Sequence, residues 1–262
     1  MNLHQLILRQ PHLQSNYCPR RTQHTRCRMS LATSPPEHTV SSANVLKLWP
    51  QSKDEIVTGK HICLEPLKEN HAGNLFPHVC GEAHAHLWDY MPRGPFHSLP
   101  DFQSYIRDCA NSEDVSFWAI RDRKTDQVVG HTSFLRIDSS NATVEIGNIM
   151  YSPSLQKTVA SSEAWFILAE RAFSCGFRRL EWKCNALNEP SRRAALRYGH
   201  EFEGVFRQHM IVKGKNRDTA WYSILDGEWP RVERAVRAWM DDSNFDENGR
   251  QLSGLVSIRE KM

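Results

Sequence analysis

The stretch LQKTVASSEAWFILAERAF, residues 155–173, begins with polar residues and continues into a segment whose apolar residues recur with the period of a helix. Small, uncharged residues occupy the position where the helix should begin, namely Thr158, Ala160, Ser161 and Ser162. Two interpretations compete for this start. It is either a helix with an ordinary N-terminal cap or a helix N-terminus whose free N–H groups receive an anion.

A strand-like segment, ATVEIGNIMY (residues 142–151), precedes this helix. In open α/β layouts, ligands bind near the carboxyl end of a strand, where the next helix starts. The unpaired N–H groups and the dipole of that helix attract a phosphate without any charged side chain, and Lys157 adds a positive charge nearby. The strand–turn–helix pattern therefore suits an anion site, and it suits a plain N-cap equally well.

The rest of the chain, from His61 onward, alternates between strand-like and helix-like segments. Strands are predicted at residues 62–67, 115–122, 128–138, 142–151, 179–185, 202–212 and 218–226. Helices are predicted at residues 69–86, 102–110, 155–173, 189–198 and 231–240. This order predicts a single α/β (α+β) domain with a mixed, mostly antiparallel sheet of about six to seven strands flanked by helices.

The N-terminal segment differs from the remainder in composition. Residues 1–36 contain five arginines and no acidic residue, which is typical of a mitochondrial transit peptide; a disordered extension and translation from Met29 are the alternatives. We therefore divide the chain into an extension (1–45), a folded domain (46–229) and a C-terminal helix with an ordered extension (230–262). The expected location is cytoplasmic, with mitochondria as the alternative.

Charge and cysteine usage argue against several function classes. Five of the 33 Lys and Arg residues lie in residues 1–36, so the remainder carries 28 basic against 30 acidic residues, which argues against nucleic acid as a partner. No apolar run is long enough to span a membrane. The seven cysteines form no CxxC pair, which suits a reducing compartment. His78, His84 and His86 lack the spacing of a helical metal pair, so no metal is expected.

Two runs of sequence point to a known family: VEIGNIMYSPSLQKTVASSEA (144–164) and NEPSRRAALRYGHEFEGVFRQ (188–208). Together with LWDYMPRGPF (87–96) and FDENGRQ (245–251), they resemble the GNAT acetyltransferase superfamily over about residues 60–250. More narrowly, they are similar to the branch that contains bacterial N-terminal acetyltransferases of ribosomal proteins and fungal relatives. The resemblance implies acetyl-CoA as cofactor and a primary amine as acceptor, either a small metabolite or a protein N-terminus.

The resemblance also implies a loop that binds the pyrophosphate of coenzyme A through backbone amides, with the pattern Q/R-x-x-G-x-G/A. This pattern corresponds to Gln156, Lys157, Thr158, Val159, Ala160 and Ser161. Val159 and Ser161 depart from it. A β-branched residue at position 159 is unfavourable if the backbone there needs a positive φ. The fungal relatives often lack this glycine too, so we expect an altered loop that still binds the pyrophosphate.

Acetylation of an amine by a thioester needs a base for the ammonium proton and a donor for the developing oxyanion, but no protein nucleophile. Glu145 is the expected base, since it lies eleven residues before Gln156, the offset at which histone-type members of the superfamily carry their catalytic glutamate. Its alternative role is a strand carboxylate bonded to a neighbouring loop. The family places the oxyanion donor on the backbone where this strand splays, so Ile149 and Met150 are expected beside the cofactor.

The expected proton donor to the leaving thiolate differs from the tyrosine that many superfamily members carry. The pattern N-x6-Y, counted from Asn188, ends on Ala195, and Tyr198 is expected to pack rather than to catalyse. The branch that this chain resembles has N-x-x-S instead, which implies that Asn188 binds the pantetheine arm and that Ser191 lies near the sulfur. Arg192 is a candidate for the phosphates of coenzyme A. An ordinary helix start, with a polar cap and a proline in the first turn, is the alternative interpretation.

Few sequence features point to the binding site of the acceptor. Trp88, Tyr90 and Phe96 surround a Pro/Gly turn, where they either wall a pocket for the acceptor or pin the core. Arg207 and Arg217 are candidate anchors for a carboxylate, or solvated surface residues. Transfer to a hydroxyl group and coenzyme A binding without turnover are the rival functions. We expect a monomer or a homodimer with no nucleic-acid or membrane partner.

Overall fold

The computed structural model describes residues 54–262, so the interpretations of residues 1–45 lie outside the described residues. Its centre is an eight-stranded sheet in the order β1-β2-β3-β4-β5-β6-β8-β7. The strands are β1 (Val57–Thr58), β2 (Ile62–Pro66), β3 (Ser116–Asp122), β4 (Val128–Asp138), β5 (Thr143–Tyr151), β6 (Arg179–Asn185), β7 (Glu201–Val212) and β8 (Lys215–Leu225). Only β5 and β6 pair in parallel, which confirms the predicted mixed, mostly antiparallel sheet; the short β1 was not predicted.

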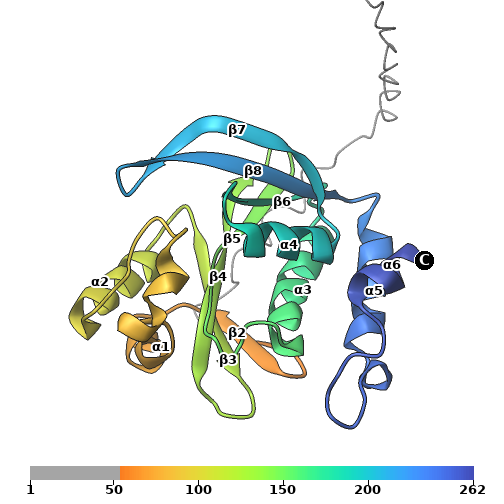
Figure 1. Ribbon diagram of the computed structural model, residues 1–262, viewed down its shortest axis with the longest axis horizontal. Coiled ribbons are helices and arrows are strands. Elements are labelled where there is room, and N and C mark those ends of the chain that lie inside the picture. Colours follow the sequence, from red (N-terminus) through yellow and green to blue (C-terminus); the bar gives the residue numbers. More distant parts are fainter. Residues whose placement is uncertain (1–53) are drawn as a thin grey trace, which may run out of the picture. The chain divides into compact units, whose positions relative to one another are not determined.

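Helices cover both faces of this sheet (Figure 1). They are α1 (His71–Val79), α2 (Leu99–Ala110), α3 (Val159–Ser174), α4 (Glu189–Tyr198), α5 (Trp229–Met240) and α6 (Leu255–Glu260), with the 3-10 helices η2 (Glu82–Trp88) and η3 (Asp242–Asn244). One core lies between the sheet and α3, α4 and α5, and it includes Val144, Trp165 and Leu180. A second core lies under α1 and α2 around Trp88 and Phe102.

The helix predicted over residues 69–86 is divided into α1 and η2, so the prediction of one continuous helix is wrong. Cys80 is extended and Gly81 has a φ of 80°, a region that glycine adopts readily and other residues rarely do. The chain turns at these two residues and continues as a 3-10 helix. This turn delivers the fully buried Trp88 to the second core.

The C-terminal segment completes the main core. Trp229, Val232 and Val236 of α5 are buried against it. Arg259 of α6 donates hydrogen bonds to the carbonyl groups of Arg197 (2.8 Å) and Leu196 (3.1 Å) at the end of α4. The segment beyond residue 229, predicted as a helix with an ordered extension, therefore packs on the domain and supports α4. None of the helices among residues 54–262 is both long and apolar enough to cross a lipid bilayer.

Pairing between β5 and β6 covers only the first part of each strand. The register pairs Thr143–Glu145 with Arg179–Glu181, after which β5 and β6 have no further paired residues. On its other edge, β5 is irregular against β4, because the pairing passes from His131↔Met150 to Ser133↔Gly147. A bulge of this kind bends the strand that carries the extra residues. The two strands therefore separate in the middle of the sheet, next to the turn that leads into α3.

His200, between α4 and β7, is a fully buried ionisable group in the main core. Its ring centroid lies 5.6 Å from that of Trp182 and 5.8 Å from that of Trp165. Burial lowers the pKa of His200 to about 3, and Arg179 and Arg259 act in the same direction. As the pH falls below about 6.5, His200 takes up a proton in the unfolded chain but stays neutral in the folded protein, so a falling pH favours unfolding.

We predict that His200→Phe reduces the pH dependence of stability. Because the folded pKa lies below the unfolded one, the contribution of neutral His200 is complete above about pH 6.5 and is lost as the pH falls towards 3. The slope of the free energy of unfolding against pH, measured by urea denaturation, should decrease by about 1 kcal/mol per pH unit in the acid range. The exposed His86 is the control, and His86→Gln should leave the slope unchanged. An unaltered slope in His200→Phe would contradict the assignment.

Candidate functional site

The start of α3 carries an ordinary N-cap. The side chain of Thr158 (φ −102°, ψ 166°) accepts a hydrogen bond from the Ser161 amide at 3.1 Å, and the Ser161 hydroxyl donates to the Thr158 carbonyl at 2.8 Å. The expectation of free N–H groups at this helix start is therefore wrong for the Ser161 amide. The amides of Val159 and Ala160 lie in the first turn, where a helix offers them no acceptor of its own. These two donors stay available to an anion.

The backbone accommodates Val159 without strain. Val159 is the first residue of α3, and its half-buried side chain packs against the main core. The positive φ of this loop, 61°, occurs at Lys157 instead. The departure from the family's glycine at position 159 is thus compatible with the loop, because the left-handed residue stands two positions earlier. Lys157 and Gln156 are exposed, and the Gln156 side chain donates to the Tyr151 carbonyl at 3.0 Å.

The bulge of β5 lies where the strand separates from β6. Asn148 has a φ of 50° and its side chain donates to the Ser133 hydroxyl at 3.0 Å, which holds the bulge against β4. Asparagine tolerates this conformation better than most residues. Met150 is buried in the second core and Ile149 packs against the main core. The segment expected beside the cofactor is therefore fixed from both faces of the sheet.

Glu145 lies immediately before this bulge, and its carboxylate lies over Gly147. A Cβ atom added to Gly147 would lie 3.1 Å from Glu145 Oε1 and 2.9 Å from a methyl group of Leu135. Glu145 is 5% exposed, and its Oε2 atom lies 3.0 Å from Arg136 Nε and 3.1 Å from Lys183 Nζ. Burial raises the pKa of Glu145 above its ordinary value, while Lys183 and Arg136 act in the opposite direction.

Lys183 connects Glu145 to the next two strands. Its side chain is 3% exposed, and its Nζ atom lies 2.8 Å from Glu181 Oε2 and 3.7 Å from the ring centroid of Trp221 on β8. Lys183, Arg136 and Trp221 were not among the site residues expected from the sequence. The alternation in RLEWKCN (179–185) was the available signal, because Leu180, Trp182 and Cys184 face the helices and leave Glu181 and Lys183 on the opposite face.

The start of α4 has the geometry of an ordinary capped helix, which was the alternative interpretation of the N-x-x-S motif at Asn188 and Ser191. Asn188 is the N-cap, and its side chain accepts from the Ser191 amide at 3.2 Å. The Ser191 hydroxyl accepts from Trp182 Nε1 at 3.0 Å. Burial raises the pKa of the neighbouring Cys184 thiol, and a hydrogen bond from Ser191 acts in the opposite direction, so this hydroxyl also faces Cys184. Arg192 Nε lies 3.1 Å from the Tyr222 hydroxyl and its guanidinium 3.5 Å from Glu189, so it is held within the fold.

Tyr198 packs in the core, as predicted. Its ring stacks on Trp165 with the centroids 4.3 Å apart, and its hydroxyl donates to Ser162 at 3.3 Å. It is 6% exposed. Tyr198, three residues beyond the position at which the N-x6-Y pattern places its tyrosine, therefore has a structural role.

The three aromatic residues for which the sequence left two roles open, a wall of the acceptor pocket or a contact within the core, differ from one another. Trp88 is fully buried and donates through Nε1 to the Val79 carbonyl at 2.7 Å, so its assignment to a pocket wall is wrong. Phe96 packs edge-on against Trp88, at 4.9 Å between ring centroids, and pins the same core. Tyr90 is exposed, and its hydroxyl lies 3.1 Å from the Leu187 carbonyl in the β6–α4 loop.

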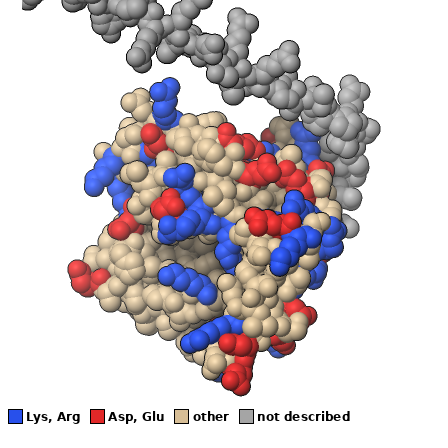
Figure 2. Space-filling model, turned by 45° about the vertical axis from the view of Figure 1, so that its right-hand side comes forward, with Lys and Arg blue, Asp and Glu red and all other residues tan. Residues whose placement is uncertain are grey.

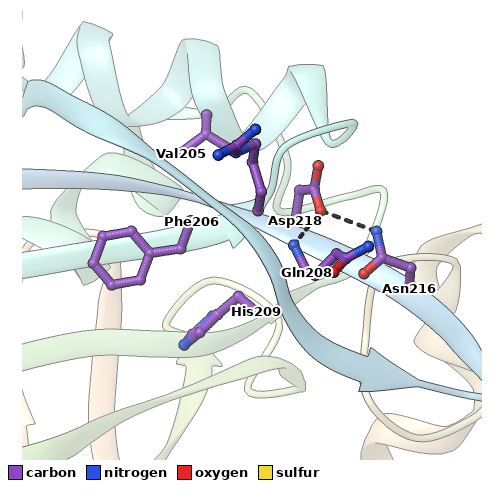
Figure 3. A pocket seen from close by; sticks show the side chains of 7 residues that line it. Val205, Phe206, Gln208, His209, Asn216 and Asp218 are labelled. Atoms are coloured by element: carbon purple, nitrogen blue, oxygen red, sulfur yellow. Dashed lines mark hydrogen bonds between the residues drawn. The ribbon is translucent and has the colours of Figure 1, made fainter.

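The β7–β8 hairpin reaches across the sheet to this segment, since Lys213 Nζ at its tip donates to the Trp88 carbonyl at 2.7 Å. A large open pocket of about 830 Å³ lies on the hairpin where β7 bulges (Figure 3). It is lined by Val205, Phe206, Arg207, Gln208, His209, Asn216 and Asp218. Among residues 54–262, no group of three or more His, Cys, Asp or Glu residues is arranged to hold a metal ion.

The chain is similar in sequence and in structure to known proteins, and these proteins carry related descriptions. Residues 61–201 match the family described as acetyltransferase (GNAT) domain. A GCN5-related N-acetyltransferase from Brucella melitensis superimposes with a TM-score of 0.77 at 38% identity, over 80% of this chain and 96% of that one. An uncharacterized N-acetyltransferase of Bacillus licheniformis is 27% identical over 53% of this chain and 80% of its own length. A ribosomal-protein-serine acetyltransferase of Escherichia coli is 30% identical over 40% of this chain and 59% of its own length.

We predict that Asp218 holds the bulge of β7 in place. Its Oδ1 atom accepts from the Gln208 amide at 2.7 Å and from Asn216 Nδ2 at 2.9 Å, and Gln208 has a φ of 50° (Figure 3). Asp218→Ala should accelerate hydrogen exchange at the Gln208 amide about tenfold or more, since that donor loses its acceptor. Asp218→Asn keeps an acceptor and should change it less.

The pH dependence gives a second check on the same contact. Hydrogen bonds from the Gln208 amide and Asn216 lower the pKa of Asp218. The Gln208 amide should therefore stay protected from hydrogen exchange above the ordinary pKa of an aspartate. This protection should be lost as the pH falls through the lowered pKa of Asp218. Residue-resolved exchange measured by NMR reports both effects. Equal exchange in wild type and Asp218→Ala would show that the bulge does not depend on this carboxylate.

Proposed function

The chain belongs to the GNAT acetyltransferase family, and on that premise we propose that it transfers the acetyl group of acetyl-CoA directly to a primary amine. The acceptor is a small metabolite or a protein N-terminus. The observation that carries this proposal is the separation of β5 from β6 beside the start of α3. The second half of β5 thereby has no strand partner on this edge, and a helix N-terminus follows it, which suits a long cofactor that ends in a diphosphate.

In this proposal the loop before α3 binds the diphosphate. The amides of Val159 and Ala160 supply the donors, and the exposed Lys157 supplies a positive charge, while Gln156, Thr158 and Ser161 shape the loop. Figure 2 shows a hollow in one face of the molecule with Lys and Arg side chains along its edge, which also suits a polyanionic cofactor. Arg192 contributes only if it leaves Tyr222 when the cofactor binds.

The remainder of the cofactor lies along β5 and α4 in this proposal. The amides of Ile149 and Met150 face the thioester, where one of them donates to the carbonyl oxygen as it becomes an oxyanion. The side-chain amide of Asn188 keeps its N–H donors for the pantetheine arm, because only its oxygen is used in the cap. Ser191 donates its hydroxyl proton as a hydrogen bond to the departing thiolate, instead of to Cys184.

Glu145 receives the proton of the acceptor ammonium, directly or through water. The nitrogen then attacks the carbonyl carbon, a C–N bond forms and the C–S bond breaks. The second proton that the nitrogen loses neutralises the departing thiolate of coenzyme A. A buried carboxylate with a raised pKa is suited to this role at neutral pH. The neighbouring Lys183 and Arg136 also favour the neutral form of an incoming amine, since like charges lower the pKa of an ammonium group.

A hydroxyl acceptor is the second candidate. It is favoured by the name of the relative from Escherichia coli, a ribosomal-protein-serine acetyltransferase. A hydroxyl group needs the same base and the same oxyanion donor, so the residues assigned above serve either acceptor. Thiol release measured with matched amines and alcohols distinguishes the two, and a protein that binds acetyl-CoA but releases no thiol with either would be a binding domain only.

We predict that Val159→Pro weakens the binding of coenzyme A about tenfold, because proline removes one amide donor from a charged acceptor. Proline is tolerated at the first helical position, and the extended Thr158 before it is compatible with a following proline. Pantetheine lacks the diphosphate, so its affinity should not change. Val159→Ala keeps the amide and serves as the matched control. Calorimetric titration measures all four affinities, and an equal loss for pantetheine would contradict the assignment of this amide.

We predict that Glu145→Gln lowers kcat about 100-fold and leaves the affinity for coenzyme A unchanged. The loss should be largest at low pH, where little of the amine is spontaneously neutral. Glu181→Gln is the matched control, since Glu181 contacts the same lysine at 2.8 Å but lies outside the proposed chemistry. Thiol release at saturating acceptor is the measurement. Wild-type rates in Glu145→Gln, or equal losses in both variants, would remove Glu145 as the base.

A further inference from the structure

The face of the sheet that carries Glu145 continues onto β6 and β8. The register pairs Lys183 with Trp221, and Arg217 stands four residues before Trp221 on the same strand. Side chains at even spacing along a strand share one face, so Arg217 lies on the face of Trp221 and Lys183. The register thus sets Arg217 at the far end of the face that carries Lys183, the lysine whose Nζ atom lies 3.1 Å from Glu145 Oε2.

Arg217 differs from the other cations of this face in having no carboxylate partner. Lys183 pairs with Glu145 and Glu181, and Arg136 pairs with Glu145. Arg217 is half-buried, and within residues 54–262 it forms no ion pair, while its buried Nε–H has no acceptor. A partly desolvated guanidinium without a counter-charge is unfavourable, so an arrangement of this kind calls for an anion. Burial lowers the pKa of Arg217, as expected for such a group.

A second donor of the same face is also without an acceptor. Trp221 Nε1 is buried and has no hydrogen-bond partner among the described residues. The hydroxyl group between the two donors, on Thr219, is already engaged with His209 Nδ1 at 2.9 Å. This part of the face therefore offers unpaired N–H groups and few acceptors. A ligand that complements it presents oxygen acceptors rather than donors.

Aromatic rings surround these donors. The ring centroid of Phe206 lies 4.7 Å from that of Trp221, and that of His209 lies 5.8 Å from it. Phe206 is 53% exposed, so its ring is accessible at the mouth of the site. Such a wall accommodates the apolar body of a small acceptor between its two polar ends.

We propose that the acceptor carries an oxyanion, a carboxylate or a phosphate, that binds Arg217 while its amine reaches Glu145. This inference rests on the proposed acetyl transfer and specifies its acceptor. A guanidinium binds a carboxylate or a phosphate through two parallel N–H groups, which orients the ligand as well as holding it. Polyamines and other polycationic acceptors are excluded, because Arg217, Arg136 and Lys183 repel additional positive charge.

Matched acceptors test the charge requirement. Thiol release from acetyl-CoA is measured with amino acids and their carboxamides, with O-phosphoethanolamine and ethanolamine, and with spermidine. The expected result is a kcat/KM at least tenfold higher for the anionic member of a pair and no turnover of spermidine. The carboxylate and phosphate arms identify which oxyanion is used. Equal efficiency for an anionic acceptor and its neutral partner would overturn the inference.

Variants test the assignment to Arg217. Arg217→Ala should raise KM for the anionic acceptor about 30-fold and leave KM for acetyl-CoA unchanged, whereas Arg217→Lys should recover part of the loss. The matched control is Arg207→Ala, which removes an exposed arginine from the neighbouring strand. An unchanged KM in Arg217→Ala, or an equal rise in Arg207→Ala, would overturn the assignment.

A binding measurement separates failure of this inference from failure of the proposed function. Calorimetry with coenzyme A present compares N-acetyl amino acids with their amides, and O-phospho-N-acetylethanolamine with N-acetylethanolamine, which needs no turnover. Tighter binding of an anionic member that Arg217→Ala abolishes would support the inference even if no acceptor released thiol, in which case the acetyl transfer itself would be wrong. Absence of any preference in wild type would overturn the inference alone.

Discussion

The loss of pairing between β5 and β6 after Glu145 is the constraint on which the rest of the site depends. Two adjacent parallel strands normally exchange hydrogen bonds along their whole length. Here the bulge at Asn148, held by Ser133 of β4, turns β5 away, and the second half of β5 has no strand partner on that edge. Polar main-chain groups without a strand partner need other partners, which is why this edge suits a cofactor rich in amide and carbonyl groups.

A group of charges that stabilise one another lies where β5 and β6 stop pairing. Lys183 is almost fully buried, and a buried ammonium is tolerated only when carboxylates pair with it. Glu145 and Glu181 provide that pairing from two strands in register, and Trp221 covers the ammonium from β8. Each side chain is thereby held at a defined position. Pre-positioned charges of this kind act on a reacting amine without a further cost of reorganisation.

The start of α3 combines two properties that the sequence presented as alternatives. Thr158 caps the Ser161 amide, whereas the amides of Val159 and Ala160 lie in the first turn, where the helix itself supplies no acceptor. A capped helix can still receive an anion, because one cap satisfies only one of the four unpaired amides. The loop reaches this arrangement with a left-handed Lys157 in place of a glycine at position 159, so the backbone needed for an anion site does not depend on one residue type.

The sequence by itself determined the element order, the mixed sheet and the bounds of β4, β6 and α4, because hydrophobic periodicity and capping residues are local signals. It also located the helix start at which we propose the anion site. Only the tertiary structure decided which side chains meet: Trp88 entered the second core, while Lys183 met both Glu145 and Trp221. Contacts between strands far apart in the chain depend on register and burial, and a single sequence carries no local mark of either.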